Sequence, residues 1–175
     1  QLGNDFKFVI VGGGGTVEKL IEAVQSEKVY NVELVLPVNR TELLEYYRKS
    51  DILFLHLDNI PAFMRVLPSK LFEYAAMGKP IVAGIQGYPS EFSSKYIPYS
   101  LIFQPEQVDE CVKRIVESTE IVVNRKEVDF FIDNFSRKHL MKSFASDILK
   151  IAYADIWKSN IARVAFIRRK YKDDW

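Results

Sequence analysis

The stretch LPSKLFEYAAMGKPIVAG, residues 67–84, predicts a short helix that is followed at once by a buried strand. Pro68 ends an extended approach, Ser69 belongs to the residue types that favour helix N-caps, and Gly78 is typical of a helix end. The first amide groups of such a helix have no partner within it, and the helix dipole makes their end attractive to anions. The stretch therefore predicts a helix and strand of an α/β fold with a candidate anion site.

Two interpretations of this helix remain open from its pattern. The residues expected on its buried face are Leu71, Phe72, Ala75 and Ala76. Lys70 and Glu73 share another side, at a spacing that allows an ion pair. In the simpler interpretation they form an exposed pair on an ordinary crossover helix. In the other, both face a ligand at the start of the helix.

The rest of the chain alternates short apolar runs with helical patterns. Strands are predicted at 7–11, 31–36, 51–57, 80–84 and 100–103, and helices at 16–28, 41–50, 69–77 and 105–118. Continuous apolar strands that alternate with helices predict a doubly wound parallel sheet covered on both faces. We expect one α/β domain over residues 1–150 and a helical appendage over 151–175. Ligands of such sheets bind beyond the carboxyl ends of the strands, which here lead into loops 12–16, 37–40, 57–69 and 85–90.

Composition excludes several classes of function. The chain has 175 residues, of which 48% are hydrophobic and 27% charged, as in ordinary globular proteins. Its single cysteine, Cys111, is expected to be a packed thiol, and His56 and His139 lack metal-ligand spacing. The net charge is +1, but basic residues crowd the last part of the chain, which leaves the body mildly acidic. We therefore expect neither a metal site nor a nucleic-acid-binding face.

The glycine run in VIVGGGGTVEKL, residues 9–20, follows a predicted strand and opens a predicted helix. A dinucleotide fingerprint would need a third small residue where Val17 or Glu18 stands, and an acid after the next strand, which ends in Leu36 and Pro37. NAD binding is therefore not expected. A tight turn at Gly13 and Gly14 that brings backbone amides near an anion fits better.

LPSKLFEYAAMGKPIVA resembles the donor-binding helix of retaining GT-B glycosyltransferases of glycosyltransferase family four. It is most similar to members that build bacterial capsule, O-antigen and exopolysaccharide. FKFVIVGGGGTVEKLIE resembles the family's strand and glycine turn, and LPVNRTELLEYYRKSDILFLHL its next strand, loop and helix. The resemblance, over roughly residues 5 to 150, implies the Rossmann-like half of a GT-B fold. It implies transfer of a sugar from a nucleotide diphosphate sugar, UDP-linked, to a saccharide or lipid-linked acceptor.

The resemblance also implies which residues bind the donor. It places Glu73 on the ribose hydroxyls, and a carboxylate is suited to accept from both. Residues implied at the diphosphate, largely through backbone amides, are Ser69, Lys70 and Leu71, to which the glycine turn adds Gly13 and Gly14. Residues implied around the base are Leu36, Pro37, Val38 and Asn39. Lys70 and Glu73 are thus the expected catalytic residues, and no cofactor is expected.

Two departures from the family pattern stand out. Arg65 occupies the position of the first glutamate of the E-x7-E motif, and it suits a phosphate or an acidic donor sugar better than sugar hydroxyls. The family's first strand of this domain and its acceptor-binding domain would precede Gln1. We therefore expect a fragment that is inactive alone and works with an N-terminal acceptor domain. Without a D-x-D pair, we expect helix amides and Lys70 to stabilise the leaving group in place of a metal.

The predicted helix at 151–171 is amphipathic and basic, with aromatic and aliphatic residues at a mean spacing of 3.6. It either packs on the acceptor domain or rests on anionic lipid. No apolar run spans a bilayer and no secretory signal is visible, so we expect a cytoplasmic location, with the inner face of the cell membrane as the site of lipid contact. The alternative functions are a non-catalytic nucleotide- or sugar-binding module and a GT-B-shaped UDP-sugar epimerase, which would need carboxylates in the cleft.

Overall fold

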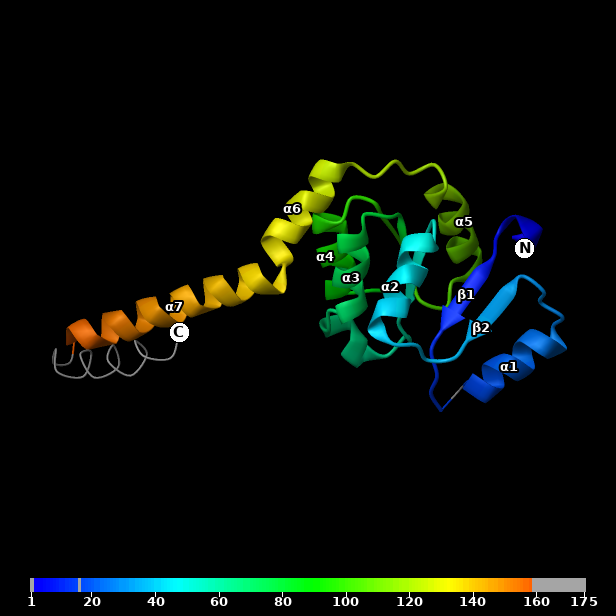
Figure 1. Ribbon diagram of the computed structural model, residues 1–175, viewed down its shortest axis with the longest axis horizontal. Coiled ribbons are helices and arrows are strands. Elements are labelled where there is room, and N and C mark those ends of the chain that lie inside the picture. The colour runs from blue at the N-terminus through cyan, green and yellow to red at the C-terminus, as the bar shows by residue number, and fades with distance from the viewer. Residues whose placement is uncertain (1, 16, 159–175) are drawn as a thin grey trace. The chain divides into compact units, whose positions relative to one another are not determined.

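The computed structural model describes residues 2–15 and 17–158 (Figure 1). Its elements are η1 (Gly3–Asp5), β1 (Phe8–Val11), α1 (Val17–Ser26), β2 (Val32–Val35), α2 (Arg40–Lys49), β3 (Leu53–His56), η2 (Pro61–Arg65), α3 (Ser69–Met77), β4 (Ile81–Gly84), α4 (Tyr88–Tyr96), β5 (Ser100–Phe103), α5 (Val108–Ser118), α6 (Arg125–Phe135) and α7 (Arg137–Lys158). Every predicted strand is present, and α3 has the predicted bounds. The helix predicted from Pro105 begins only at Val108.

All strands described run parallel, which confirms the α/β class with a parallel arrangement. They divide between two sheets, β1–β2 and β3–β4–β5, in place of the single sheet expected. Within the described residues, β1 is hydrogen-bonded only to β2, and β3 only to β4.

One hydrophobic cluster connects the two sheets. Val82 of β4, Phe103 of β5 and Ile115 of α5 are buried together. Phe8 of β1 and Cys111 of α5 are among the half-buried residues that pack against them. Cys111 is thus packed, as the sequence predicted, and burial raises the pKa of its thiol.

The chain forms two compact units, Gln1–Asp129 and Phe130–Trp175. The first holds both sheets and helices α1 to α5, and the second holds the end of α6 and all of α7. Residue 150, the predicted domain end, lies inside α7, which Figure 1 draws as one continuous helix. Of the predicted helix at 151–171, residues 151–158 belong to α7, and the remainder lies outside the described residues. Among the described helices none has the length and apolarity that a membrane span requires.

Tyr99 anchors the carboxyl end of α3 from beside β5. Its hydroxyl donates to the backbone oxygen of Ala75 at 2.7 Å, and its side chain is buried. Tyr99→Phe should lower the free energy of unfolding by about 1 kcal/mol, because the carbonyl would remain buried without this donor. Urea denaturation measures the change. Tyr88→Phe, at an exposed tyrosine, is the matched control and should leave stability unchanged; equal losses in both variants would contradict the assignment.

Candidate functional site

The start of α3 offers free backbone amides. Pro68, with an extended backbone, is the N-cap and makes no side-chain cap hydrogen bond. The prediction that Ser69 caps the helix is therefore wrong, because Ser69 is already its first helical residue. The amide of Leu71, which the resemblance implied at the diphosphate, is already paired, since it donates to the Pro68 oxygen at 3.0 Å. No described residue accepts from the amides of Ser69 and Lys70, so these two are available to an anion.

The buried face of α3 differs from the predicted one. Its buried residues are Leu71, Tyr74 and Ala75. Ala76 is exposed and Phe72 is only half-buried, so the expectation that both are core residues is wrong. Tyr74 takes their place because its ring packs edge-to-face on Tyr47 of α2, with 5.1 Å between centroids. This contact turns α3 so that Glu73 faces α2.

Among the residues that the structure describes, Glu73 has two hydrogen-bond partners, and both come from α2. Arg40 Nη1 lies 3.0 Å from Glu73 Oε1, and the Tyr47 hydroxyl donates to Oε2 at 3.5 Å. Burial, and then the charge of Glu73, raise the pKa of Tyr47, so its hydroxyl keeps the proton that it donates. Lys70 forms no ion pair with Glu73 in the part of the chain that the structure describes. The simpler interpretation, an exposed Lys70–Glu73 pair, is therefore wrong.

The glycine turn and the loop after β2 are in contact. A Cβ at Gly13 would lie 2.9 Å from Pro37 Cγ, so only glycine permits this approach. The side chain of Asn39 accepts from the amide of Glu42 at 3.0 Å and caps α2. Arg40 follows this cap and reaches Glu73, so direct contacts connect the glycine turn, residues 36–40 and α3. The sequence predicted that these segments lie together beyond the carboxyl ends of the strands.

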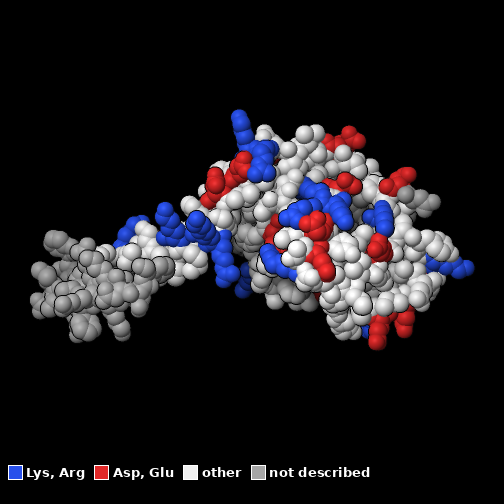
Figure 2. Space-filling model, in the orientation of Figure 1, with Lys and Arg blue, Asp and Glu red and all other residues white. Residues whose placement is uncertain are grey.

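The remaining predicted base-contacting residues line the same loop. Leu36 is 78% exposed, an unusual state for a leucine at the end of a parallel strand, while Val38 is half-buried. Charges of both signs gather over α2 beside this loop, as Figure 2 shows. The loop thus offers an exposed apolar side chain next to a charged helix.

Residues 1–135 match the model of the family described as glycosyl transferases group 1. The chain belongs to this family. No curated protein matches it. The match spans both sheets and α1 to α6, so the described α/β unit is a glycosyltransferase domain, whose chemistry is sugar transfer from a nucleotide sugar to an acceptor.

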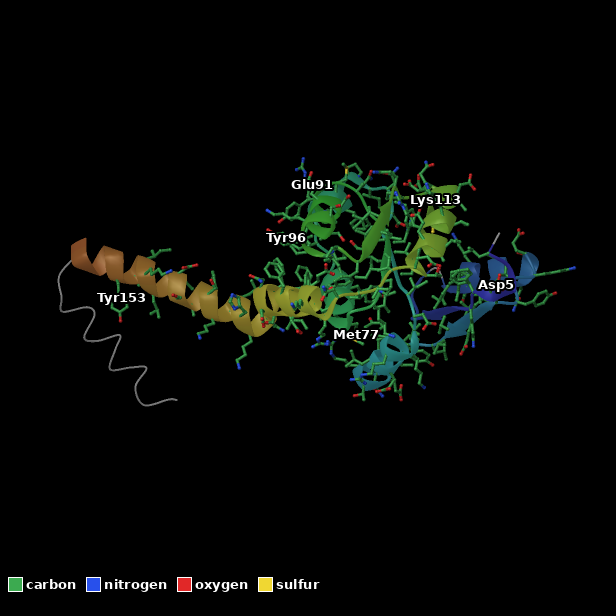
Figure 3. All side chains as sticks on the ribbon, turned by 90° about the horizontal axis from the view of Figure 1, so that it is seen from above. Asp5, Met77, Glu91, Tyr96, Lys113 and Tyr153 are labelled. Carbon is green, nitrogen blue, oxygen red and sulfur yellow. The ribbon has the colours of Figure 1, made fainter. Side chains whose placement is uncertain are left out.

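In this glycosyltransferase domain, Arg65 stands at the end of η2 and is exposed. It makes no ion pair with any described residue. η2 packs on α4, a helix that the sequence analysis missed and that Figure 3 marks by Glu91 and Tyr96. The sequence feature that could have predicted α4 is Gly87 followed by Pro89 at the second helical position, a combination typical of a helix start.

The described part of this domain holds no cluster of His, Cys, Asp or Glu able to bind a metal ion. An open groove of about 460 Å³ lies elsewhere, between α5 and residues 28–32. It borders Phe8 and Val32, the first residues of β1 and β2. Ligands of parallel sheets bind at the opposite, carboxyl ends of strands, so we do not assign the donor to this groove.

Proposed function

We propose that this domain binds the donor of a retaining, metal-independent transferase of glycosyltransferase family four. In this proposal Glu73 accepts from the ribose hydroxyls of a UDP-sugar, and the amides of Ser69 and Lys70 bind its diphosphate. Residues 36–39 surround the base, and Gly13 and Gly14 add backbone amides. The observation that carries the proposal is the position of Glu73, which Arg40 holds beside residues 36–39, the base loop. Among the described residues, Lys70 has no ion-pair partner at the start of α3.

Transfer in this proposal breaks the bond between the donor sugar's C1 and the β-phosphate oxygen. The acceptor oxygen bonds to C1 on the same face, and the acceptor proton passes to the departing diphosphate. The helix amides and Lys70 stabilise the negative charge that develops on the leaving group. In this proposal Arg65, at the end of η2, contacts the donor sugar or a phosphate.

The proposal places the reaction in the synthesis of capsule, O-antigen or exopolysaccharide in the bacterial cytoplasm. An N-terminal domain of the same protein binds the saccharide or lipid-linked acceptor. The chain's basic C-terminal part then contacts either that domain or the anionic inner face of the membrane, where a lipid-linked acceptor lies.

Calorimetric titration with UDP, GDP, CDP and TDP tests donor binding. We expect UDP to bind most tightly. Turnover of UDP-sugars by the protein with its acceptor domain, in the presence and absence of EDTA, tests the reaction. Binding without turnover would favour the non-catalytic module, whereas interconversion of UDP-sugars without acceptor would favour the epimerase. Failure to bind any of the four nucleotides would contradict the assigned site.

Lys70→Ala should weaken UDP about threefold at low salt and leave uridine unchanged, because only UDP carries the diphosphate. The difference should shrink as the salt concentration rises. Parallel titrations with UDP and uridine measure it. Lys113→Ala removes an exposed lysine of α5 and is the matched control. Equal weakening of UDP and uridine would contradict a diphosphate contact.

A further inference from the structure

Two side chains of α2 converge on one carboxylate. Arg40 and Tyr47 are seven residues apart, so they lie on the same face of the helix, two turns from each other. Each takes a different oxygen of Glu73, Arg40 at 3.0 Å from Oε1 and Tyr47 at 3.5 Å from Oε2. Arg40 thus holds one carboxylate oxygen, while the Tyr47 hydroxyl lies at the outer limit of hydrogen-bond distance from the other.

The anchoring of the two donors differs. The Tyr47 side chain is 6% exposed and its ring is fixed against Tyr74, so its hydroxyl has little freedom to move. The Arg40 side chain is 70% exposed and directly follows Asn39, the cap of α2 and the last residue of the base loop. The same helix start thus ends the base loop and supplies the cation that contacts Glu73.

Two hydrogen bonds do not exhaust a carboxylate, which has about four acceptor positions. Arg40 and Tyr47 approach from the α2 side, and no other described residue donates to Glu73, which leaves its remaining lone pairs for two hydroxyl donors. A carboxylate already held in one orientation loses less side-chain entropy when a ligand binds it. This arrangement would favour a vicinal diol over a single hydroxyl.

We infer that Arg40 is a positioning residue that holds the Glu73 carboxylate ready for the two ribose hydroxyls of the donor nucleotide. The inference rests on the proposed function. It assigns Arg40 an effect on ribose recognition, transmitted through Glu73, and no direct contact with the nucleotide. If Arg40 instead competed with the ribose for Glu73, its removal would tighten binding, so the two roles have opposite signs.

The test is a double-mutant cycle read with two nucleotides. Arg40→Gln, Glu73→Gln and the double variant are titrated calorimetrically with UDP and with 2′-deoxy-UDP. We expect Arg40→Gln to weaken UDP about threefold to tenfold and to lower the preference for UDP over 2′-deoxy-UDP. In the Glu73→Gln background the same substitution should have no further effect on either nucleotide. Arg48→Gln, which removes the α2 arginine that pairs with Glu45, is the matched control and should bind as the parent does.

The possible failures are distinguishable. A parent protein that binds UDP and 2′-deoxy-UDP equally would overturn the ribose role of Glu73, and this inference with it. If the parent prefers UDP over 2′-deoxy-UDP and the Arg40→Gln variant keeps this preference, the inference on Arg40 fails while the ribose role of Glu73 stands. Tighter binding of UDP by Arg40→Gln would have the same consequence. If Arg40→Gln weakened UDP binding equally in the parent and in the Glu73→Gln background, Arg40 would contact the nucleotide directly. Thermal unfolding of each variant verifies that the fold is retained, as expected for an exposed arginine.

Discussion

Glu73→Gln is expected to weaken UDP binding by about 1–3 kcal/mol, a loss of roughly fivefold to 150-fold in affinity. Glutamine keeps the size of the side chain but replaces one carboxylate oxygen by an amide that donates. The charge-assisted acceptance from both ribose hydroxyls is lost, and so is the ion pair with Arg40. Calorimetric titration with UDP at one fixed salt concentration measures the change.

Glu45→Gln is the control for this prediction. Glu45 lies on α2 and pairs with Arg48, so its replacement also removes one carboxylate from an arginine pair. It should leave UDP affinity unchanged, because neither residue belongs to the segments assigned to the donor. Unchanged affinity in Glu73→Gln as well would mean that the ion pair with Arg40 is only a surface contact between α2 and α3.

Gly87→Ala should lower the free energy of unfolding by about 2–4 kcal/mol. Gly87 adopts φ 65° and ψ −141°, a conformation that residues with a Cβ rarely take. An added Cβ would lie 2.6 Å from the backbone oxygen of Met64, so a whole segment of η2 would have to move. Urea denaturation measures the loss, and Gly15→Ala, with open space around its Cβ, should cost far less.

The same substitution links stability to the candidate site. η2 ends at Arg65, for which the donor sugar is one of the two proposed contacts. If Arg65 contacts the sugar, a displaced η2 should weaken a UDP-sugar more than UDP. Equal stability of Gly87→Ala and Gly15→Ala would show that η2 adapts without cost. A large loss of stability with unchanged preference for the UDP-sugar would separate η2 from donor binding.

The local elements of this domain could be predicted because their signals are short-range. Apolar runs bounded by Gly, Pro and polar residues predicted all strands described, and the α3 stretch predicted that helix with its exact bounds. α4 was missed because its sequence, YPSEFSSKY, lacks the regular apolar spacing of the other helices. Its buried Phe92 packs on Phe72 of α3, a contact between residues that are far apart in the sequence.

The candidate site could be predicted only in part. The residue types of the glycine turn, the loop at 36–39 and the start of α3 pointed to an anion and nucleotide site, and the structure connects these segments. The partner of Glu73 could not be predicted, because Lys70, three residues away, is the obvious local candidate. Arg40 is 33 residues away in the chain, and it reaches Glu73 where α2 packs on α3 through Tyr47 and Tyr74.

The sequence by itself determined the α/β class, the parallel direction of the strands and the carboxyl-end loops that carry candidate chemistry, since each follows from local pattern and chain order. Tertiary structure alone decided how the strands divide between two sheets, which face of α3 is buried, and which cation faces Glu73. The physical reason is that strand pairing and side-chain contacts between helices depend on distances in space. Tyr74 replaced Ala76 on the buried face because the Tyr47 ring offered it an edge-to-face contact, and that choice also set the direction of Glu73.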